Sequence, residues 1–434
     1  MPRHASAADT SLVRALGVRT LTASIVNATI GAGIFVLPAA VAGGLGTGAP
    51  VAYLVCAVVM ALIVTCFAMA GSRVALTGGL YAYVEVAFGP FAGFLTGILL
   101  WLSCILGSAG VVSALAASLA VLVPALGGGP ARALFVLAVF AVLALTNIRG
   151  VRGAGRLVEW LTLAKLLPLL AFVAVGAFFI RPDAPLQPTL PAAGALGDTA
   201  LLLIFAFIGI ELALVPSGEV IEPSRTVPRA IFLALGATTA MYLAIQFVAQ
   251  GVLGSDLTRF ADAPLMEASG RFLGRAGQVV MLVGTMVSMF GYASGDMLGA
   301  PRLLFAFGRD GLLPAALARV HPRHRTPHVA IAVHAVLVAA LTLVGSFGVL
   351  ALLSNIATLT LYLLCCAGAW ELARRDVRAG GIPFAVPGGP AIPIMACAAI
   401  LWLLSHATWQ EVAAQGAVIA LATAFYVLRP ASWR

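Results

Sequence analysis

The sequence predicts an all-α polytopic membrane protein with 12 transmembrane helices. Three observations support this prediction: the 434 residues are 62% hydrophobic and 9% charged, they divide into long apolar segments, and arginines gather at the ends of those segments. Soluble domains carry about 25% charged residues, so the composition excludes that class. The net charge of +9 is scattered over short connections, which indicates membrane topology and anionic headgroups rather than nucleic-acid binding.

Each apolar segment is long enough to cross a bilayer, since a transmembrane helix needs about 20 mostly apolar residues. Polar stretches such as 127–130 and 181–183 separate the segments. The predicted spans lie near 21–45, 50–72, 90–123, 131–148, 157–180, 196–220, 229–254, 276–303, 327–345, 347–372, 391–407 and 410–429.

Arginine placement predicts the orientation of these spans. With the amino terminus inside, 19 arginines fall on the cytoplasmic side and 5 on the outer side. Basic residues concentrate in cytoplasmic loops, so we expect both termini in the cytoplasm and a bacterial inner-membrane location. The first 20 residues are polar and lack an apolar core before a cleavage site. The first span is therefore expected to serve as its own insertion signal.

Two spans contain helix-breaking residues at matching positions. The first reads NATIGAGIFVLP over 27–38, and the sixth reads FAFIGIELALVP over 205–216. Glycine costs up to about 1 kcal/mol in a helix interior and proline about 3 kcal/mol. Backbone groups freed in this way persist in a membrane only beside a cavity or a ligand. Because the two spans are five apart, the pattern predicts inverted repeats around a central site; a pair of ordinary glycine-kinked helices is the alternative.

This arrangement divides the chain into four parts. Residues 1–20 form a cytoplasmic segment, 21–180 the first five-helix repeat and 196–372 the second, inverted repeat, and 391–429 add two C-terminal helices. The predicted fold is thus an inverted 5+5 repeat in which spans one and six are broken.

The breaks also predict a ligand. A broken helix exposes N–H groups at one end and carbonyls at the other, and an α-amino acid has a carboxylate and an ammonium group to satisfy both. In the first break, the N–H groups of Gly31, Ala32 and Gly33 are expected to bind the carboxylate. The expected ammonium acceptors are the carbonyls of Thr29 or Ile30 and those of Phe205, Ala206 and Ile208; Phe207 and Gly209 belong to the same sixth-span break.

Lys165 is the only lysine in the chain and lies in the apolar run LTLAKLLPLLAFV. A charge at the bilayer centre costs roughly 2.5–3.5 kcal/mol, so its ammonium must face protein or a water cavity. A desolvated lysine can lose its proton, whereas arginine stays charged. We therefore expect Lys165 to couple proton movement to transport. A lysine that snorkels toward a membrane face is the alternative.

Four stretches of the chain resemble the amino acid–polyamine–organocation transporters, in the bacterial amino acid permease branch. IGAGIF resembles the family's first-span break, and TGGLYAY its loop after span two. SGEVIEPSRTVPRAI is similar to the segment after span six, and PRLLFAFGRDGLLP to the signature after span eight. These stretches occupy 30–35, 77–83, 217–231 and 301–314, and the resemblance runs from about residue 15 to 430.

The resemblance implies a secondary transporter that works by alternating access, with substrate bound at the two breaks. Lys165 matches the fifth-span lysine that stands where related carriers bind sodium. Its ammonium is then expected to contact a carbonyl near Gly31, and a hydroxyl of Thr285 or Ser288 is a further candidate partner.

The resemblance also assigns side chains around the substrate. Phe205 matches the aromatic lid, and Ala32 replaces a hydroxyl residue that many members place between the glycines, so one carboxylate contact is expected to be missing. The third span is expected to line the side-chain pocket with Ser103, Cys104 and Ser108.

Two acidic residues inside predicted spans keep alternative roles. Asp296 could pair with a cationic substrate, carry a proton, or be satisfied by helix neighbours and water. Glu211, directly after the sixth-span break, is expected either to relay protons or to make a structural hydrogen bond.

Together these features predict a proton-coupled amino acid permease. An exchanger of the same fold is the nearest alternative, and a sensor that binds without transporting is a more distant one. No enzyme is expected, because the chain lacks HExxH, GxSxG and GK[ST] motifs. We expect no cofactor and no metal, since the six cysteines form no CxxC pair and suit core packing. The expected partners are an amino acid, a proton and the bilayer.

Overall fold

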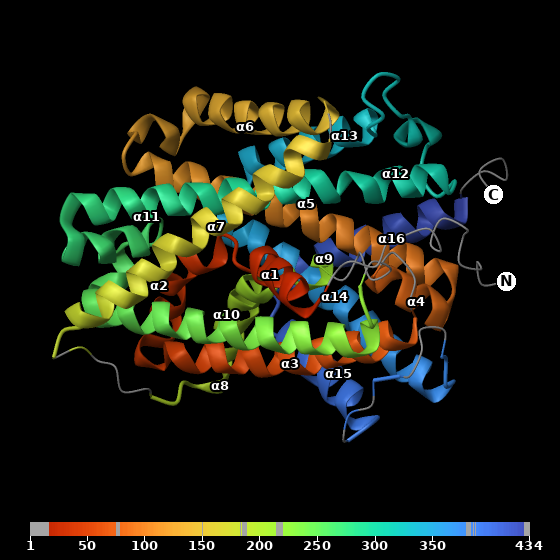
Figure 1. Ribbon diagram of the computed structural model, residues 1–434, viewed down its shortest axis with the longest axis horizontal. Coiled ribbons are helices and arrows are strands. Elements are labelled where there is room, and N and C mark those ends of the chain that lie inside the picture. Colours follow the sequence, from red (N-terminus) through yellow and green to blue (C-terminus); the bar gives the residue numbers. More distant parts are fainter. Residues whose placement is uncertain are drawn as a thin grey trace.

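The computed structural model describes residues 17–74, 79–149, 151–182, 184, 189–213, 220–378, 383–384, 386 and 388–428, with the backbone alone for 151–163, 212–213 and 223–224. The predicted segment 1–20 and the motif stretches 77–83 and 217–231 therefore lie partly outside the described residues, as does Pro216. Within the described part the chain is built of long helices that run side by side in one bundle (Figure 1).

A helix coincides with each predicted apolar segment. The first half of the chain contains α1 (Val18–Thr29), α2 (Gly33–Leu45), α3 (Ala49–Arg73), α5 (Pro90–Ala120), α6 (Gly129–Arg149), α7 (Val151–Gly176), α8 (Ala193–Leu203) and α9 (Ile210–Ala213). The second half contains α10 (Pro223–Leu253), α11 (Pro264–Gly299), α13 (His328–Val344), α14 (Phe347–Arg374), α15 (Ala391–Leu404) and α16 (Trp409–Leu428). Two short helices, α4 (Leu80–Phe88) and α12 (Pro301–Arg309), lie at one end of the bundle (Figure 1).

Among the described residues, 7 helical stretches are long and apolar enough to cross a membrane, and four shorter apolar helices accompany them. The first of the long stretches, Gly33–Arg73, covers α2 and α3 together. Such a set of helices is that of a multi-pass membrane protein. The 12-span count, the inverted repeat and the cytoplasmic termini remain predictions.

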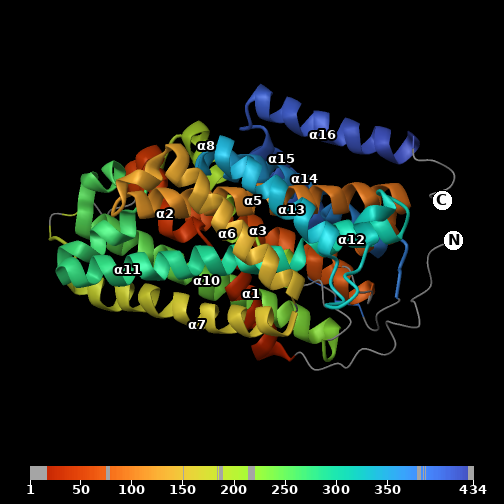
Figure 2. The same ribbon diagram turned by 90° about the horizontal axis from the view of Figure 1, so that it is seen from above.

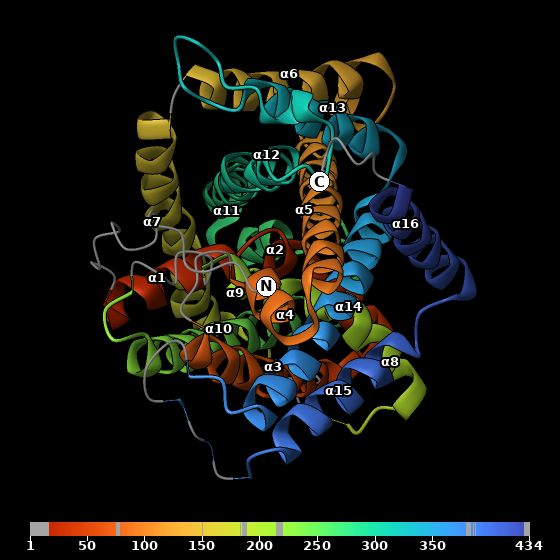
Figure 3. The same cartoon turned by 90° about the vertical axis from the view of Figure 1, so that its right-hand side faces the viewer.

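Large apolar side chains are exposed on the outside of the bundle, as expected where lipid is the solvent. Leu134 is 70% exposed, Val336 67% and Ile394 63%. Helix α16 lies along the edge of the bundle (Figure 2), and only 11% of its apolar window is buried. The end-on view shows α5 passing through the interior, with α6 and α13 side by side at the periphery (Figure 3).

The α11 segment begins earlier than the sequence predicts. The predicted span is 276–303, whereas the helix starts at Pro264 and changes direction at Gly274, whose φ of 58° and ψ of −147° are non-helical. The first part of this helix is polar and charged and includes Glu267, so hydropathy did not indicate that it belongs to the span. The turn at Gly274 needs glycine, because other residues rarely adopt a positive φ.

Both predicted interruptions are present in the backbone. Helix α1 ends at Thr29 and α2 begins at Gly33, with Ile30 at ψ 88° between them. In the sixth segment α8 passes into the 3-10 turn η5 (Ile204–Phe207), and Gly209 has φ 121°. Pro38 lies within α2 and does not end it. The interruption of the first span therefore comes from the glycine-rich stretch and not from the proline.

We expect Gly209→Ala to destabilise the protein. A Cβ at this position would lie 2.5 Å from the carbonyl oxygen of Ala28, and the positive φ adds strain of roughly 1–3 kcal/mol. The melting temperature of the purified protein in detergent measures the effect. Gly416→Ala is the matched control, because a Cβ there meets nothing within 4 Å. Equal melting temperatures for the two variants would contradict the prediction.

Candidate functional site

The two broken helices meet at the centre of the bundle. A Cβ at Gly33 would lie 2.8 Å from the Cα of Ala206, and one at Gly209 would lie 2.5 Å from the carbonyl oxygen of Ala28. Each break therefore uses a glycine where the other backbone approaches. This contact brings together the residues that the sequence predicts as the substrate site, namely Thr29, Ile30, Gly31, Ala32 and Gly33 with Phe205, Ala206, Phe207, Ile208 and Gly209.

The expected N–H donors of the first break differ in their bonding. The N–H of Gly31 donates to the carbonyl of Thr29 at 2.9 Å, so it is already occupied. Among the described residues, the N–H groups of Ala32 and Gly33 have no hydrogen-bond partner. They stand at the amino-terminal end of α2, where the helix dipole favours an anion. Two of the three predicted donors are thus available to a carboxylate.

The carbonyl end of α1 is held by Lys165 of α7. The Lys165 Nζ donates to the carbonyl oxygens of Asn27 at 2.5 Å and Ile30 at 2.7 Å, and the residue is only 3% exposed. A cation at the carboxyl end of a helix is stabilised by the helix dipole. The ammonium therefore points at the break and away from lipid. It binds two carbonyls, one in the last turn of α1 and one directly after that helix, whereas the sequence led us to expect one.

Two other helices complete this carbonyl end. Ser288 of α11 donates to the carbonyl of Gly31 at 3.3 Å. The second expected hydroxyl, that of Thr285, instead bonds within its own helix to Met281 at 2.9 Å. Tyr242 of α10 lies with its hydroxyl 3.2 Å from the carbonyl of Thr29 and 2.8 Å from that of Ala206. Tyr242 thus bridges the two breaks.

Glu211 ties the sixth-span break to α14. Its carboxylate accepts a hydrogen bond from the N–H of Gly209 at 3.0 Å and a second from the hydroxyl of Tyr362. The side chain is 3% exposed. Both partners are donors, so they stabilise the ionised carboxylate. The sequence identified Glu211 but neither of these partners.

Asp296 of α11 has a partner that the sequence did not suggest. Its carboxylate lies 2.9 Å from Nε2 of His334 on α13, and Nδ1 of that ring accepts from Nε1 of Trp101 at 3.3 Å. Because indole can only donate, Nδ1 must be the acceptor and Nε2 carries the proton that binds Asp296. The result is a Trp–His–Asp chain across three helices. His334 is fully buried.

The third span contributes side chains in different ways. The Ser103 hydroxyl is hydrogen-bonded to Ser354 at 3.3 Å and to Thr358, so it fastens α5 to α14. Cys104 is buried beside the Asp296 carboxylate. Ser108 is fully buried, and its hydroxyl has no partner in the described part of the chain.

Tyr292 joins the first break to the third span, and sequence reasoning missed it. A Cβ at Gly31 would touch its ring at 3.2 Å, and one at Gly107 would lie 2.9 Å from its hydroxyl. The lack of side chains at both glycines makes room for this aromatic ring. Tyr292 therefore forms part of the wall between the break and α5.

A cavity of about 550 Å³ opens at the end of the bundle that arginine placement predicts to be extracellular. Its lining includes Val36, Leu202, Arg132 and Phe347. The Phe347 ring packs edge-on against Phe205, with centroids 5.6 Å apart and planes at 87°. This aromatic pair stands between the cavity and the sixth-span break.

Comparison with known proteins agrees with this architecture. The chain matches the family profile described as Amino acid permease over residues 16–428. It is similar to the branched-chain amino acid permease BcaP of Bacillus subtilis (strain 168), at 29% identity over 428 residues, 93% of this chain and 90% of the relative.

Two further relatives come from the same bacterium. A methylthioribose transporter is 30% identical over 424 residues, 92% of this chain and 90% of that protein. The serine/threonine exchanger SteT is 28% identical over 406 residues, 91% of each chain. Because the family profile covers nearly the whole sequence, the protein belongs to the amino acid permease family of the amino acid–polyamine–organocation superfamily, which are membrane transporters and not enzymes.

Proposed function

We propose that this protein carries an amino acid across the bacterial plasma membrane by alternating access, driven by proton symport. The observation that supports the proposal most directly is the meeting of two broken helices at Gly33 and Ala206. One break offers unpaired N–H groups, and a buried lysine binds the carbonyls next to them. A zwitterionic substrate and a proton, carried by Lys165, can therefore both bind at the break between α1 and α2.

The substrate's carboxylate would bind the N–H groups of Ala32 and Gly33. Its ammonium would meet sixth-span carbonyls, and that of Ile208 is the most available one, because Ala206 already accepts from Tyr242 and Phe205 from the N–H of Ile208. The Phe205 ring, supported by Phe347, would act as the lid toward the outer cavity. Binding from both breaks would then hold the carrier in an occluded state.

Lys165 would link proton binding to this movement. When protonated, it makes two charge-assisted hydrogen bonds that hold the end of α1 against α7. Loss of the proton removes the charge and leaves fewer donors, which loosens α1. In the proposed cycle Lys165 is protonated while substrate is bound and the outer side is open. After the carrier turns inward and the substrate leaves, Lys165 releases its proton into the cytoplasm.

Lys165→Ala should abolish uptake driven by an inward proton gradient, because no titratable amine then remains at the break. Uptake of labelled amino acid into proteoliposomes, with and without the gradient, measures this. Arg19→Ala, which removes a basic residue near the start of α1, serves as the control. Full dependence on the gradient in the lysine variant would contradict the mechanism. Strict dependence of uptake on internal amino acid would instead favour the exchanger alternative.

Tyr242→Phe should weaken substrate binding and lower stability, because it removes the hydroxyl from which the buried carbonyl of Ala206 accepts, whereas the carbonyl of Thr29 still accepts from the N–H of Gly31. Such a loss costs roughly 1–3 kcal/mol. Tyr53→Phe is the matched control: its ring lies 6.4 Å from that of Tyr242, but its hydroxyl bonds only to Gln246. Binding and melting temperature can be measured on both. Equal effects would mean that the bridge between the breaks has no special role.

We propose a neutral amino acid as the substrate. Asp296 of α11 is the acidic residue that could favour a substrate with a cationic side chain. Its carboxylate already accepts a hydrogen bond from His334. Two other charged groups lie at the breaks and both are engaged: Glu211 accepts from Gly209 and Tyr362, and Lys165 donates to the carbonyls of Asn27 and Ile30. The other side chains of the predicted substrate site are apolar, hydroxyl or thiol groups. The relatives BcaP and SteT are named for branched-chain amino acids and for serine and threonine, which are all neutral.

A thermal-shift screen against the twenty amino acids, agmatine and putrescine should therefore give stabilisation by neutral compounds. Asp296→Asn should keep the ranking of ligands, since the asparagine carbonyl can still accept from His334. Selective stabilisation by arginine or agmatine, lost in Asp296→Asn, would contradict this assignment and give Asp296 a direct role in binding a cation.

A further inference from the structure

A second cavity, of about 440 Å³, lies at the end of the bundle that is predicted to face the cytoplasm. It is formed where α3 and α14 end and α15 begins, and its lining includes Arg73, Trp370, Ala373, Arg374, Phe384 and Pro393. None of these residues takes part in the central site. The cavity combines two guanidinium groups with aromatic and apolar walls.

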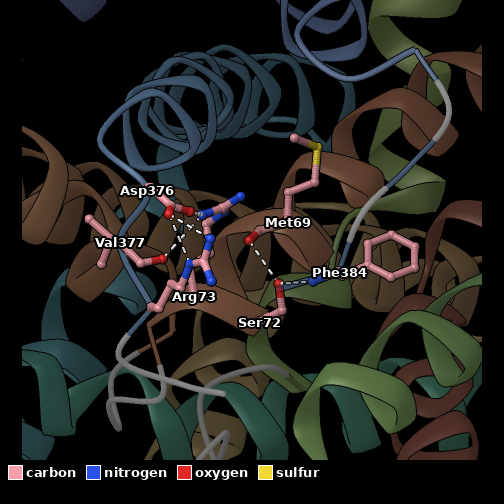
Figure 4. A network of polar contacts seen from close by, with 7 residues as sticks. Met69, Ser72, Arg73, Asp376, Val377 and Phe384 are labelled. Carbon is pink, nitrogen blue, oxygen red and sulfur yellow. Dashed lines mark hydrogen bonds and ion pairs between the residues drawn. The ribbon is translucent and has the colours of Figure 1, made fainter. Parts of the chain in front are cut away.

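Arg73 lines this cavity and is incompletely paired; Figure 4 shows its contacts with Asp376 and Val377. Its side chain is only 14% exposed, and Nη1 contacts Asp376 at 3.4 Å and the carbonyl of Val377 at 3.2 Å. The buried Nε has no hydrogen-bond partner within the part of the chain that the structure describes. Asp376 is shared, because Arg378 binds its other oxygen at 2.7 Å. Those hydrogen bonds, first from Arg378, lower the pKa of Asp376 and keep it ionised.

Arg374 also shares its carboxylate. Glu371 accepts from Arg374 at 2.8 Å and from Arg375 at 2.6 Å. The ion pairs around Asp376 and Glu371 together contain four guanidinium groups and two carboxylates, which leaves a surplus of two positive charges. The guanidinium groups are those of Arg73, Arg374, Arg375 and Arg378. The cavity thus has the charge to attract an anion.

The Phe384 part of the cavity wall is held in place by a hydrogen bond. Ser72 accepts from the N–H of Phe384 at 2.9 Å and donates to the carbonyl of Met69 at 3.0 Å (Figure 4). Phe384 is thereby tied to the end of α3. The cavity lining therefore contains a fixed aromatic ring, that of Phe384, as well as the Arg73 guanidinium.

The surroundings indicate that the anion carries an apolar tail. Helix α15 continues from the cavity with exposed apolar side chains, Ile394 at 63%, Met395 at 48% and Leu401 at 54%. Trp370 is 42% exposed and lies under the Arg374 guanidinium, 5.8 Å from its ring centroid. Tryptophan with arginine is typical of the membrane interface. A free phosphate would make no use of the apolar wall.

We propose that this cavity binds the headgroup of an anionic phospholipid, with the phosphate between Arg73 and Arg374 and an acyl chain along α15. Basic pockets between helices on the cytoplasmic side recognise such headgroups. A lipid bound here contacts the ends of α3 and α14 and the start of α15. It therefore holds together helices that lie outside the two breaks and stabilises the scaffold against which the broken helices move.

The chain offers a matched pair of variants. Arg374 and Arg375 are neighbours and both bind Glu371, but only Arg374 is among the residues that line the cavity. We expect phosphatidylglycerol added to the detergent-purified full chain to raise the melting temperature of wild type and of Arg375→Gln. Arg374→Gln should need about fivefold more of the lipid for the same shift, since each basic residue contributes roughly that factor at a membrane surface.

Two further arms separate the possible outcomes. Ala373→Phe fills the cavity without changing the charge and should remove the lipid-dependent shift. Phosphatidylcholine and inorganic phosphate should leave the melting temperature unchanged. An equal loss in Arg374→Gln and Arg375→Gln would overturn the proposal in favour of a diffuse charge effect. A phosphate-induced shift like that of phosphatidylglycerol would replace the lipid site with a free-anion site.

Discussion

The interior of this bundle depends on how the main-chain groups at the two helix breaks find partners. Lipid supplies none, and each unpaired group in the membrane costs several kcal/mol. At the carboxyl end of α1, three side chains from three different helices meet this need: Lys165, Tyr242 and Ser288. Among the described residues, the N–H groups of Ala32 and Gly33 at the start of α2 have no partner. In our proposal, this asymmetry between a satisfied carbonyl end and an open N–H end is what binds the carboxylate of the substrate.

The same geometry links the two ligands that the proposed cycle requires. Ile30, whose carbonyl binds Lys165, is separated by one residue from Ala32, whose N–H is free. A change in the charge of the amine therefore acts on the peptide unit next to the substrate's carboxylate. Tyr242 extends this connection to the sixth segment through Ala206. Coupling needs no long pathway, because the two sites share one turn of chain.

The outer part of the fold follows a different requirement. Helices α15 and α16 pack against α14 and turn apolar side chains toward lipid, as the exposed Ile394 and Leu421 illustrate. At the predicted cytoplasmic end, guanidinium groups outnumber carboxylates around the ends of α3 and α14. In the predicted orientation this charge faces the cytoplasm, and in our proposal it binds lipid as well. The proposed site at the breaks and the lipid-facing scaffold thus use separate sets of residues.

Residues that are out of place in a membrane helix can be recognised from the sequence alone. Glycines in two matching spans, one lysine and two buried acids are visible without any structure, because each violates the local preference for an apolar, uninterrupted helix. The partners of these residues follow from the tertiary structure. Tyr242, Tyr362, Tyr292 and His334 are ordinary helix residues in the sequence, and their roles arise from where helices far apart in the chain cross. The sequence left three roles open for Asp296, and the crossing of α11 with α13 adds a hydrogen bond from His334 that the sequence did not indicate. The sequence shows which residue stands at each position of a helix, whereas helix packing determines which residues it contacts.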